Sequence, residues 1–212
     1  VQAETKGGKF HFRPSIYWNR FQDRYEFYRG APDKSPFNYN RTDVFGLNLN
    51  SWFDWILGRT AFGAEFRNED LVSGNLGEPL DNPIHIHGTD RNYAYGLNRS
   101  NLSFYLEHNV ILKRFTLSAG FTAVKNTWNE MPFKIYPGVD VSYRIGQNWK
   151  VFASYNMSLR MPSFTELYYS VDGHKADKYL KPEEMSAVEG GVRYVSEGIT
   201  GTLSVYHHHG TN

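Results

Sequence analysis

Hydrophobic and polar residues alternate along most of this chain. Residues 115–127 show the pattern most clearly, because Phe115, Leu117 and Phe121 lie on one side and mostly Thr, Ser and Gly on the other. A period of two is typical of a β-strand with one apolar and one polar face. The same pattern predicts nine strands, at residues 9–20, 39–53, 59–72, 98–112, 115–127, 133–145, 149–160, 184–196 and 199–212. No stretch predicts a helix, so the predicted fold class is all-β with antiparallel up-and-down strands.

The lengths of the strands and of their connections favour a membrane barrel. The predicted strands have about 12 residues, whereas strands of globular proteins average about 5–6. Long loops are predicted at 21–38, 73–97 and 161–183, a medium loop near 126–131, and tight turns at 54–58, 113–114, 146–148 and 197–198. Outer-membrane barrels alternate short periplasmic turns with long extracellular loops, and a Greek-key sandwich has no reason to do so. We therefore predict part of a transmembrane outer-membrane β-barrel, with Trp55, Phe115 and Trp149 beside tight turns in an interfacial girdle.

Two prolines oppose this interpretation. Pro14 and Pro137 fall inside predicted strands, where proline cannot donate a hydrogen bond to a neighbouring strand. We expect a local bulge at each.

Composition excludes several other classes of protein. The 212 residues carry a formal net charge of +1, so we predict no nucleic-acid partner. There is no cysteine, no Gly-x-Ser-x-Gly, no phosphate-binding loop and no His-Glu-x-x-His, so we predict neither an enzyme nor a cofactor. The mean hydropathy is −0.57, and no run of about 18 apolar residues predicts a membrane helix.

Residues 160–191 carry a motif, which reads RMPSFTELYY, then a polar loop, then LKPEEMSAVEGG. It resembles the late barrel region of TonB-dependent outer-membrane receptors, which often show Arg-x-Pro-Ser/Thr-aromatic-x-Glu-Leu-Tyr/Phe, then Leu-x-Pro-Glu, then Glu-x-Gly. The matching positions are Arg160, Pro162, Ser163, Phe164, Glu166, Leu167, Tyr168, Leu180, Pro182, Glu183, Glu189 and Gly191. The family often has Asn-Pro where this chain has Ala176-Asp177-Lys178. The resemblance covers about residues 155–212.

The resemblance implies a location, a function and partners. Such receptors lie in the bacterial outer membrane among lipid and import a scarce, bulky nutrient, commonly a ferric siderophore, haem or cobalamin. An N-terminal plug fills their lumen, and the TonB protein supplies energy. We find no plug sequence here and expect residues 1–212 to be a barrel segment that lacks the plug, the TonB-contacting region and the C-terminal strands. The alternative is a secreted β-sandwich that binds carbohydrate or another ligand.

Candidate ligand-binding residues lie in the predicted loops and at their ends. They are His85, His87, Arg91, Tyr93, Tyr95, Trp128, Glu166, Tyr168 and Tyr169. His85-x-His87 places two imidazoles on one side of an extended segment, but no third ligand is near in the sequence, so we predict no metal site. We interpret His207-His208-His209 as native strand.

Charged residues occupy the polar sides of the predicted strands, where we expect them to face the lumen. They are Glu65, Arg67, Glu107, Lys134, Asp140, Arg144, Glu189 and Arg193. They are candidates for a transport path, but for most of them we favour the alternative, a set of cross-strand pairs that hold shape and water.

Strand direction predicts an open sheet. In a meander of nine strands the first and last are parallel, so they cannot close an antiparallel ring. We therefore expect two unpaired edges, which other strands or other copies cover.

Overall fold

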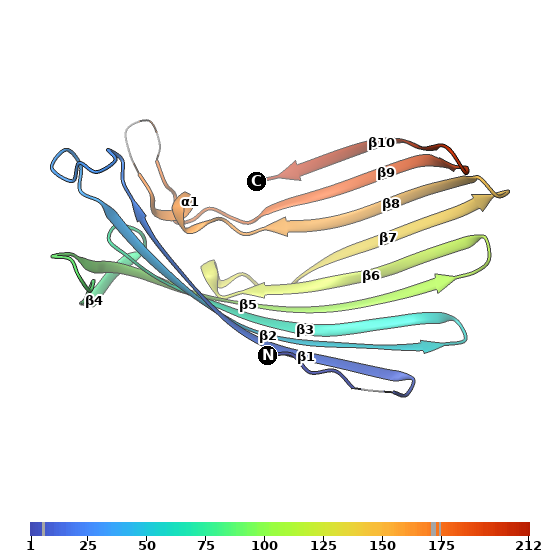
Figure 1. Cartoon of the computed structure of the whole chain (residues 1–212), viewed down its shortest axis with the longest axis horizontal. Helices are drawn as coiled ribbons and strands as arrows, with labels where there is room; N and C mark the ends of the chain where they lie inside the picture. Colours follow the sequence, from blue (N-terminus) through green and yellow to red (C-terminus); the bar gives the residue numbers. More distant parts are fainter. Residues whose placement is uncertain (6, 171–172, 174) are drawn as a thin grey trace.

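The computed structural model describes residues 1–5, 7–170, 173 and 175–212. These residues form one curved antiparallel sheet (Figure 1). Its strands are β1 (Phe10–Tyr25), β2 (Asn38–Trp55), β3 (Gly58–Ser73), β4 (Glu78–His85), β5 (Asn92–Ile111), β6 (Phe115–Asn126), β7 (Lys134–Ile145), β8 (Trp149–Arg160), β9 (Glu183–Val195) and β10 (Thr200–Thr211). The 3-10 helix η1 (Trp128–Glu130) and the helix α1 (Phe164–Tyr168) complete the fold. All nine predicted strands are present.

The sheet is an up-and-down meander with the order β1-β2-β3-β5-β6-β7-β8-β9-β10, and β4 pairs with β5 beside this path. The tight turns gather at one end, which we call the short-turn end, and the long connections gather at the other, the long-loop end (Figure 1). In the described part of the chain no second sheet covers this one, so a β-sandwich is not what the sequence forms. No helix in that part is both long and apolar enough to cross a membrane.

The two outermost strands are not paired with each other among the described residues, in agreement with the expected open sheet. Part of the outer edge of β1 is covered by the chain's own first residues. The backbone N–H of Ala3 donates to the carbonyl of Pro14 at 3.1 Å, and that of Thr5 donates to Phe12 at 3.0 Å.

Two predicted loops contain more strand than expected. The prediction of a loop at 73–97 was wrong, because this segment holds β4 and the first residues of β5. The pairing of β6 with β5 ends at Asn126↔Asn101, and β4 pairs with the part of β5 that lies beyond this point. The predicted loop 21–38 is also shorter, because β1 continues to Tyr25.

A helical turn replaces the loop expected at Ser163–Tyr169. The Ser163 side chain accepts a hydrogen bond from the Glu166 N–H, and the Glu166 carboxylate accepts one from the Ser163 N–H. This reciprocal capping box is a strong start signal for a helix. It favours a helical turn even in a segment of only five residues.

The expected bulges at the prolines are not observed, because the register is continuous at both. The Pro14 carbonyl bonds Ala3, and in an antiparallel ladder the N–H and C=O of a residue point to the same side. The missing N–H of Pro14 therefore weakens only the contact with residues 1–5 and leaves the ladder to β2 intact. Pro137 lies where pairing to β8 ends, since the β7–β8 ladder begins at Gly138.

One face of the sheet is an apolar band. The register aligns Phe62 with Leu106 and Leu106 with Phe121 across β3, β5 and β6. Leu106, Phe121 and Val139 expose 42, 40 and 41% of their surface, so this face is not covered as a globular core would be. Trp55 and Trp149 lie at its short-turn end, as the predicted girdle requires.

The opposite, polar face is tied together by tyrosines that reach over glycines. Tyr17 of β1 crosses Gly46 of β2 and donates to Glu65 of β3 at 3.4 Å. Tyr105 of β5 likewise crosses Gly63 of β3 and donates to Asn50 of β2 at 2.9 Å. A Cβ on Gly63 would lie 2.4 Å from the Leu49 carbonyl oxygen and 2.6 Å from the Tyr105 ring, so this position requires glycine. Contacts between strands two apart indicate that the polar face is concave.

The one hydrophobic cluster of buried residues found in the described chain lies at the long-loop end. Val72, Ile86 and Tyr93 form it, and Tyr39 and Leu80 pack against it. It fixes β4 to the projecting ends of β2, β3 and β5. The long-loop end is therefore a packed structure that holds side chains in defined places.

Candidate functional site

The predicted ligand-binding residues all lie at the long-loop end, but the structure separates them into distinct groups. Trp128 and Tyr168 line one groove, and His85, His87 and Tyr93 line another. The remaining four, Arg91, Tyr95, Glu166 and Tyr169, line neither groove. The nine residues thus share one end of the sheet, and a role for them in ligand binding stays a prediction.

Trp128 and Tyr168 meet in a groove of about 260 Å³, which we call the junction groove. Its lining residues are Glu78, Leu97, Trp128, Tyr168, Lys178 and Tyr179. They come from β4, β5, η1, α1 and the segment before β9, so five segments build one site. The rings of Trp128 and Tyr168 meet edge to face with centroids 6.1 Å apart, an arrangement that aromatic pairs favour.

Glu78 joins β4 to the α1 side of the junction groove. Its Oε1 accepts hydrogen bonds from the Tyr168 hydroxyl at 3.1 Å and from Lys178 Nζ at 3.3 Å. Burial, together with the hydrogen bond to the Glu78 carboxylate, raises the pKa of Tyr168 to about 12. Tyr168 therefore stays neutral near pH 7 and acts as a hydrogen-bond donor. The groove presents aromatic rings beside one carboxylate and one ammonium.

Glu166 does not line the junction groove. It belongs to an ion cluster, in which Arg160 donates to Glu166 at 2.9 and 3.0 Å and to Glu183 at 2.8 and 2.9 Å. The hydrogen bonds from Arg160, followed by those from Ser163, lower the pKa of Glu166 to about 2. The cluster fixes α1 between the end of β8 and the start of β9, which gives the family-like motif a structural role.

Acid should release α1. Because the pKa of Glu166 is lowered from its usual 4.5 to about 2, its ionised form stabilises the loop fully above about pH 4.5. That contribution is lost as the pH falls through about 2. The chain has no cysteine, so a spin label on Thr165→Cys reports α1 alone, and its mobility should rise on acidification. If mobility is unchanged down to pH 2, Glu166 does not hold the helix.

The second groove, the histidine groove, has a volume of about 540 Å³. Its lining residues are Gln22, Asp23, Arg24, Tyr39, Arg41, His85, Ile86, His87 and Tyr93. His85 and His87 are exposed on either side of buried Ile86. Tyr93 is 5% exposed and lies under Arg41, whose guanidinium carbon is 5.6 Å from the ring centroid. Tyr93 is therefore mainly a packing residue.

The described residues hold no group of three or more His, Asp or Glu side chains arranged to bind a metal ion. Arg91, Tyr95 and Tyr169 line neither groove. The Arg91 side chain lies 3.7 Å from Asp90, and Tyr169 closes α1 by donating its N–H to the Thr165 carbonyl at 2.9 Å.

The eight charges predicted to face the lumen share the polar face. The register aligns Glu65 with Ser103, and Asp140 with Ser118 and Ser154, and it places the other six on the same side. Lys134 spans β8 to bind Glu184 of β9 at 2.6 Å. The register thus groups these charges as predicted, and their facing a lumen stays a prediction.

Comparison with known proteins places the chain in a family. A family model described as "TonB dependent receptor-like, beta-barrel" matches residues 4–212. The chain belongs to the TonB-dependent receptors. It is therefore part of a barrel of the bacterial outer membrane, and its apolar face meets lipid. The family is one of transporters without enzymatic activity, in agreement with the prediction of no enzyme.

Solved structures share the fold of this receptor segment. A point mutant of the ferric enterobactin receptor PfeA of Pseudomonas aeruginosa matches with a TM-score of 0.78 and 14% identity over 100% of this chain and 34% of that chain. The FrpB iron transporter of Neisseria meningitidis matches with a TM-score of 0.68 and 14% identity, over 98% of this chain and 36% of that chain. The copper transporter OprC matches with a TM-score of 0.67 and 14% identity, over 92% of this chain and 35% of that chain. The chain spans about a third of the length of these receptors.

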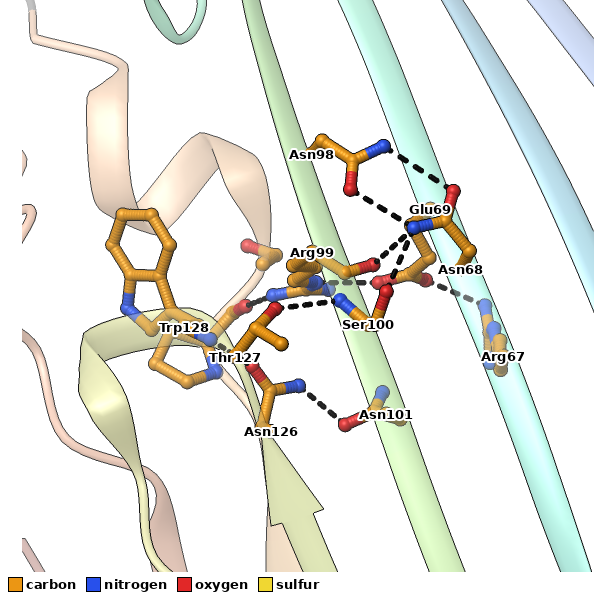
Figure 2. A network of polar contacts seen from close by, with 12 residues as sticks. Arg67, Asn68, Glu69, Asn98, Arg99, Ser100, Asn101, Asn126, Thr127 and Trp128 are labelled. Atoms are coloured by element: carbon orange, nitrogen blue, oxygen red, sulfur yellow. Dashed lines mark hydrogen bonds and ion pairs between the residues drawn. The ribbon is translucent and has the colours of Figure 1, made fainter.

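Sequence reasoning about this receptor segment missed several residues of the long-loop end. Glu78, Lys178 and Tyr179 of the junction groove fell in predicted loops, where no periodicity marks them. Glu69 and Arg99 form a buried ion pair between β3 and β5 (Figure 2). Glu69 continues the alternation of Glu65 and Arg67, a signal that placed it on the polar face but did not reveal its partner.

Proposed function

We propose that this chain belongs to a receptor that imports a scarce, bulky nutrient across the outer membrane, and that the nutrient is a ferric siderophore. The observation that carries the proposal is the junction groove, which five segments build at the long-loop end. The solved relatives support the choice of nutrient, since their names refer to ferric enterobactin, iron and copper. Haem and cobalamin are the alternative ligands.

The groove suits part of such a ligand rather than all of it. Its 260 Å³ lies below the usual range of about 300–1,000 Å³ for small-molecule sites. Trp128, Tyr168 and Tyr179 offer rings for stacking on a planar group, and Lys178 offers a cation for an acidic one. Histidine-groove residues at the same end, His85 and His87, are proposed as further contacts, together with the loop residues Arg91, Tyr95, Glu166 and Tyr169.

The remaining surfaces fit the same proposal. The polar face would line the lumen, where the eight charged residues would meet water, plug or passing ligand. TonB would contact the receptor through its N-terminal region, outside this chain. From Phe10 to Trp18 the apolar side of β1 spans eight steps, or about 26 Å, which matches an outer-membrane apolar band of about 25 Å.

Substitution of Trp128 tests the proposal. In the whole receptor, Trp128→Ala should weaken binding by about 2 kcal/mol, or roughly 30-fold, because large aromatic side chains contribute much of the energy of an interface. Equilibrium binding to the receptor in detergent, measured separately with ferric enterobactin, haem and cobalamin, gives the readout.

Trp149→Ala is the matched control, because Trp149 lies on the apolar face at the short-turn end. It should leave affinity unchanged. Tight binding of haem or cobalamin alone would reject the siderophore, and equal affinities of the Trp128 and Trp149 variants would reject the junction groove.

A further inference from the structure

We propose that Arg99 is a positioning residue, which seats the connection between β8 and β9 on β5 and so completes the junction groove. In the sheet, β6, β7 and β8 lie between β5 and this connection. Strand pairing therefore does not bring them together, and a side chain must do so. Arg99 of β5 makes such a contact.

Arg99 is only 8% exposed and contacts three groups at once. Its Nε binds the Glu69 carboxylate, and its Nη1 donates to the Pro162 carbonyl oxygen at 2.6 Å. Its guanidinium carbon lies 4.3 Å from the centroid of the Phe164 ring. Pro162 and Phe164 flank Ser163, the N-cap of α1, so two of the three contacts hold the start of this helix.

The shape of the guanidinium explains why arginine occupies this position. A planar fork can donate in two directions while its face stacks on an aromatic ring, which a lysine ammonium cannot do. Figure 2 shows Arg99 and Glu69 pointing toward each other from β5 and β3. Glu69 supplies the charge that a buried guanidinium requires, and Arg67 Nη2 holds Glu69 from the other side at 2.6 Å.

The tether acts on the junction groove through α1. Phe164 begins the helix and Tyr168 ends it, so one rigid turn links the Arg99 contact to a residue that lines the groove. Release of Phe164 would therefore displace Tyr168 from Trp128 and from Glu78. This consequence for binding rests on the proposed function, whereas the seating of the loop does not.

A spin label on Thr165→Cys in the whole receptor tests the seating without any ligand. Arg99→Ala should shift the label from the immobilised to the mobile spectral component, and Arg99→Lys should restore little of the immobilised signal. Phe164→Ala removes the same stacking contact from the loop side without leaving a buried charge unpaired. It should mobilise the label too, so the test does not depend on the folding of the Arg99 variants.

Arg67→Ala is the matched control. The Arg67 side chain binds the same Glu69 carboxylate as Arg99, and in the described part of the chain its guanidinium donates a hydrogen bond to Glu69 alone. The label should stay immobilised in this variant. Immobilised spectra for both Arg99→Ala and Phe164→Ala, or equal mobility in Arg67→Ala, would overturn the proposal.

Ferric enterobactin binding to the same variants separates the two proposals. Weaker binding by Arg99→Ala than by Arg67→Ala supports the effect on the groove. A mobile label with unchanged affinity rejects that effect and leaves the seating intact. Absence of binding by the unaltered receptor rejects the siderophore but does not alter the spectra.

Discussion

Arginine in place of Phe121 is expected to destabilise the barrel by about 2–4 kcal/mol, because a charge near the bilayer midplane loses its hydration. Phe121 lies between Leu106 and Pro137 in the apolar band, and no other part of the described chain covers it. In Phe121→Arg, the new guanidinium would face lipid on every side except the one that meets the sheet. Equilibrium unfolding of the receptor in lipid vesicles measures the change.

Thr122→Arg is the matched control, one residue further along the same strand. Thr122 lies on the polar face and lines an open groove of about 310 Å³ with Tyr105 and Tyr136, so a long charged side chain has room near water. Its cost should be far smaller than that of Phe121→Arg. Equal losses at the two positions would contradict the assignment of the faces.

Loss of the Glu69 carboxylate is the second large expected effect. Glu69→Ala should cost about 3–5 kcal/mol, because it leaves the buried Arg99 guanidinium without a counter-charge. The Pro162 carbonyl remains as a partner but carries no net charge. Unfolding measurements on Glu69→Ala, Arg99→Ala and the double variant form a cycle that isolates the pair.

The cycle has a definite expected form. The double variant should be less destabilised than the sum of the two single variants, because it also removes the Arg99 guanidinium that Glu69→Ala leaves without a counter-charge. Strict additivity would show that the pair is not coupled. Arg67→Ala should cost much less, since the Arg67 side chain is 43% exposed.

The sequence predicted the barrel wall well because lipid and lumen impose a period of two along each strand. Phe115 to Asn126 shows how closely the boundaries follow, since β6 ends one residue before the predicted end. The tight turns were equally clear, because few residue types suit them. The short-turn end was therefore predictable from local pattern alone.

The long-loop end was not predictable, because contacts between distant residues determine it. Glu78 and Tyr168 are 90 positions apart, and no local pattern relates them. β4 lacks a periodic face and is held by its ladder to β5. The helix α1 is the exception, since Ser163 and Glu166 have the spacing of a capping box, and this signal was present in the sequence.

The strands differ in length, and this gives the outer edge of the wall an uneven height. β2, β3 and β5 have 18, 16 and 20 residues, whereas β6 to β8 have 12 each. A membrane requires only about 9–11 residues per strand. The β5–β6 ladder ends at Asn101↔Asn126, so the nine residues Asn92–Ser100 carry β5 about 30 Å beyond β6. At the long-loop end the wall of this segment is therefore high over β2, β3 and β5 and low over β6, β7 and β8. The helix α1 lies beside the low part of the wall.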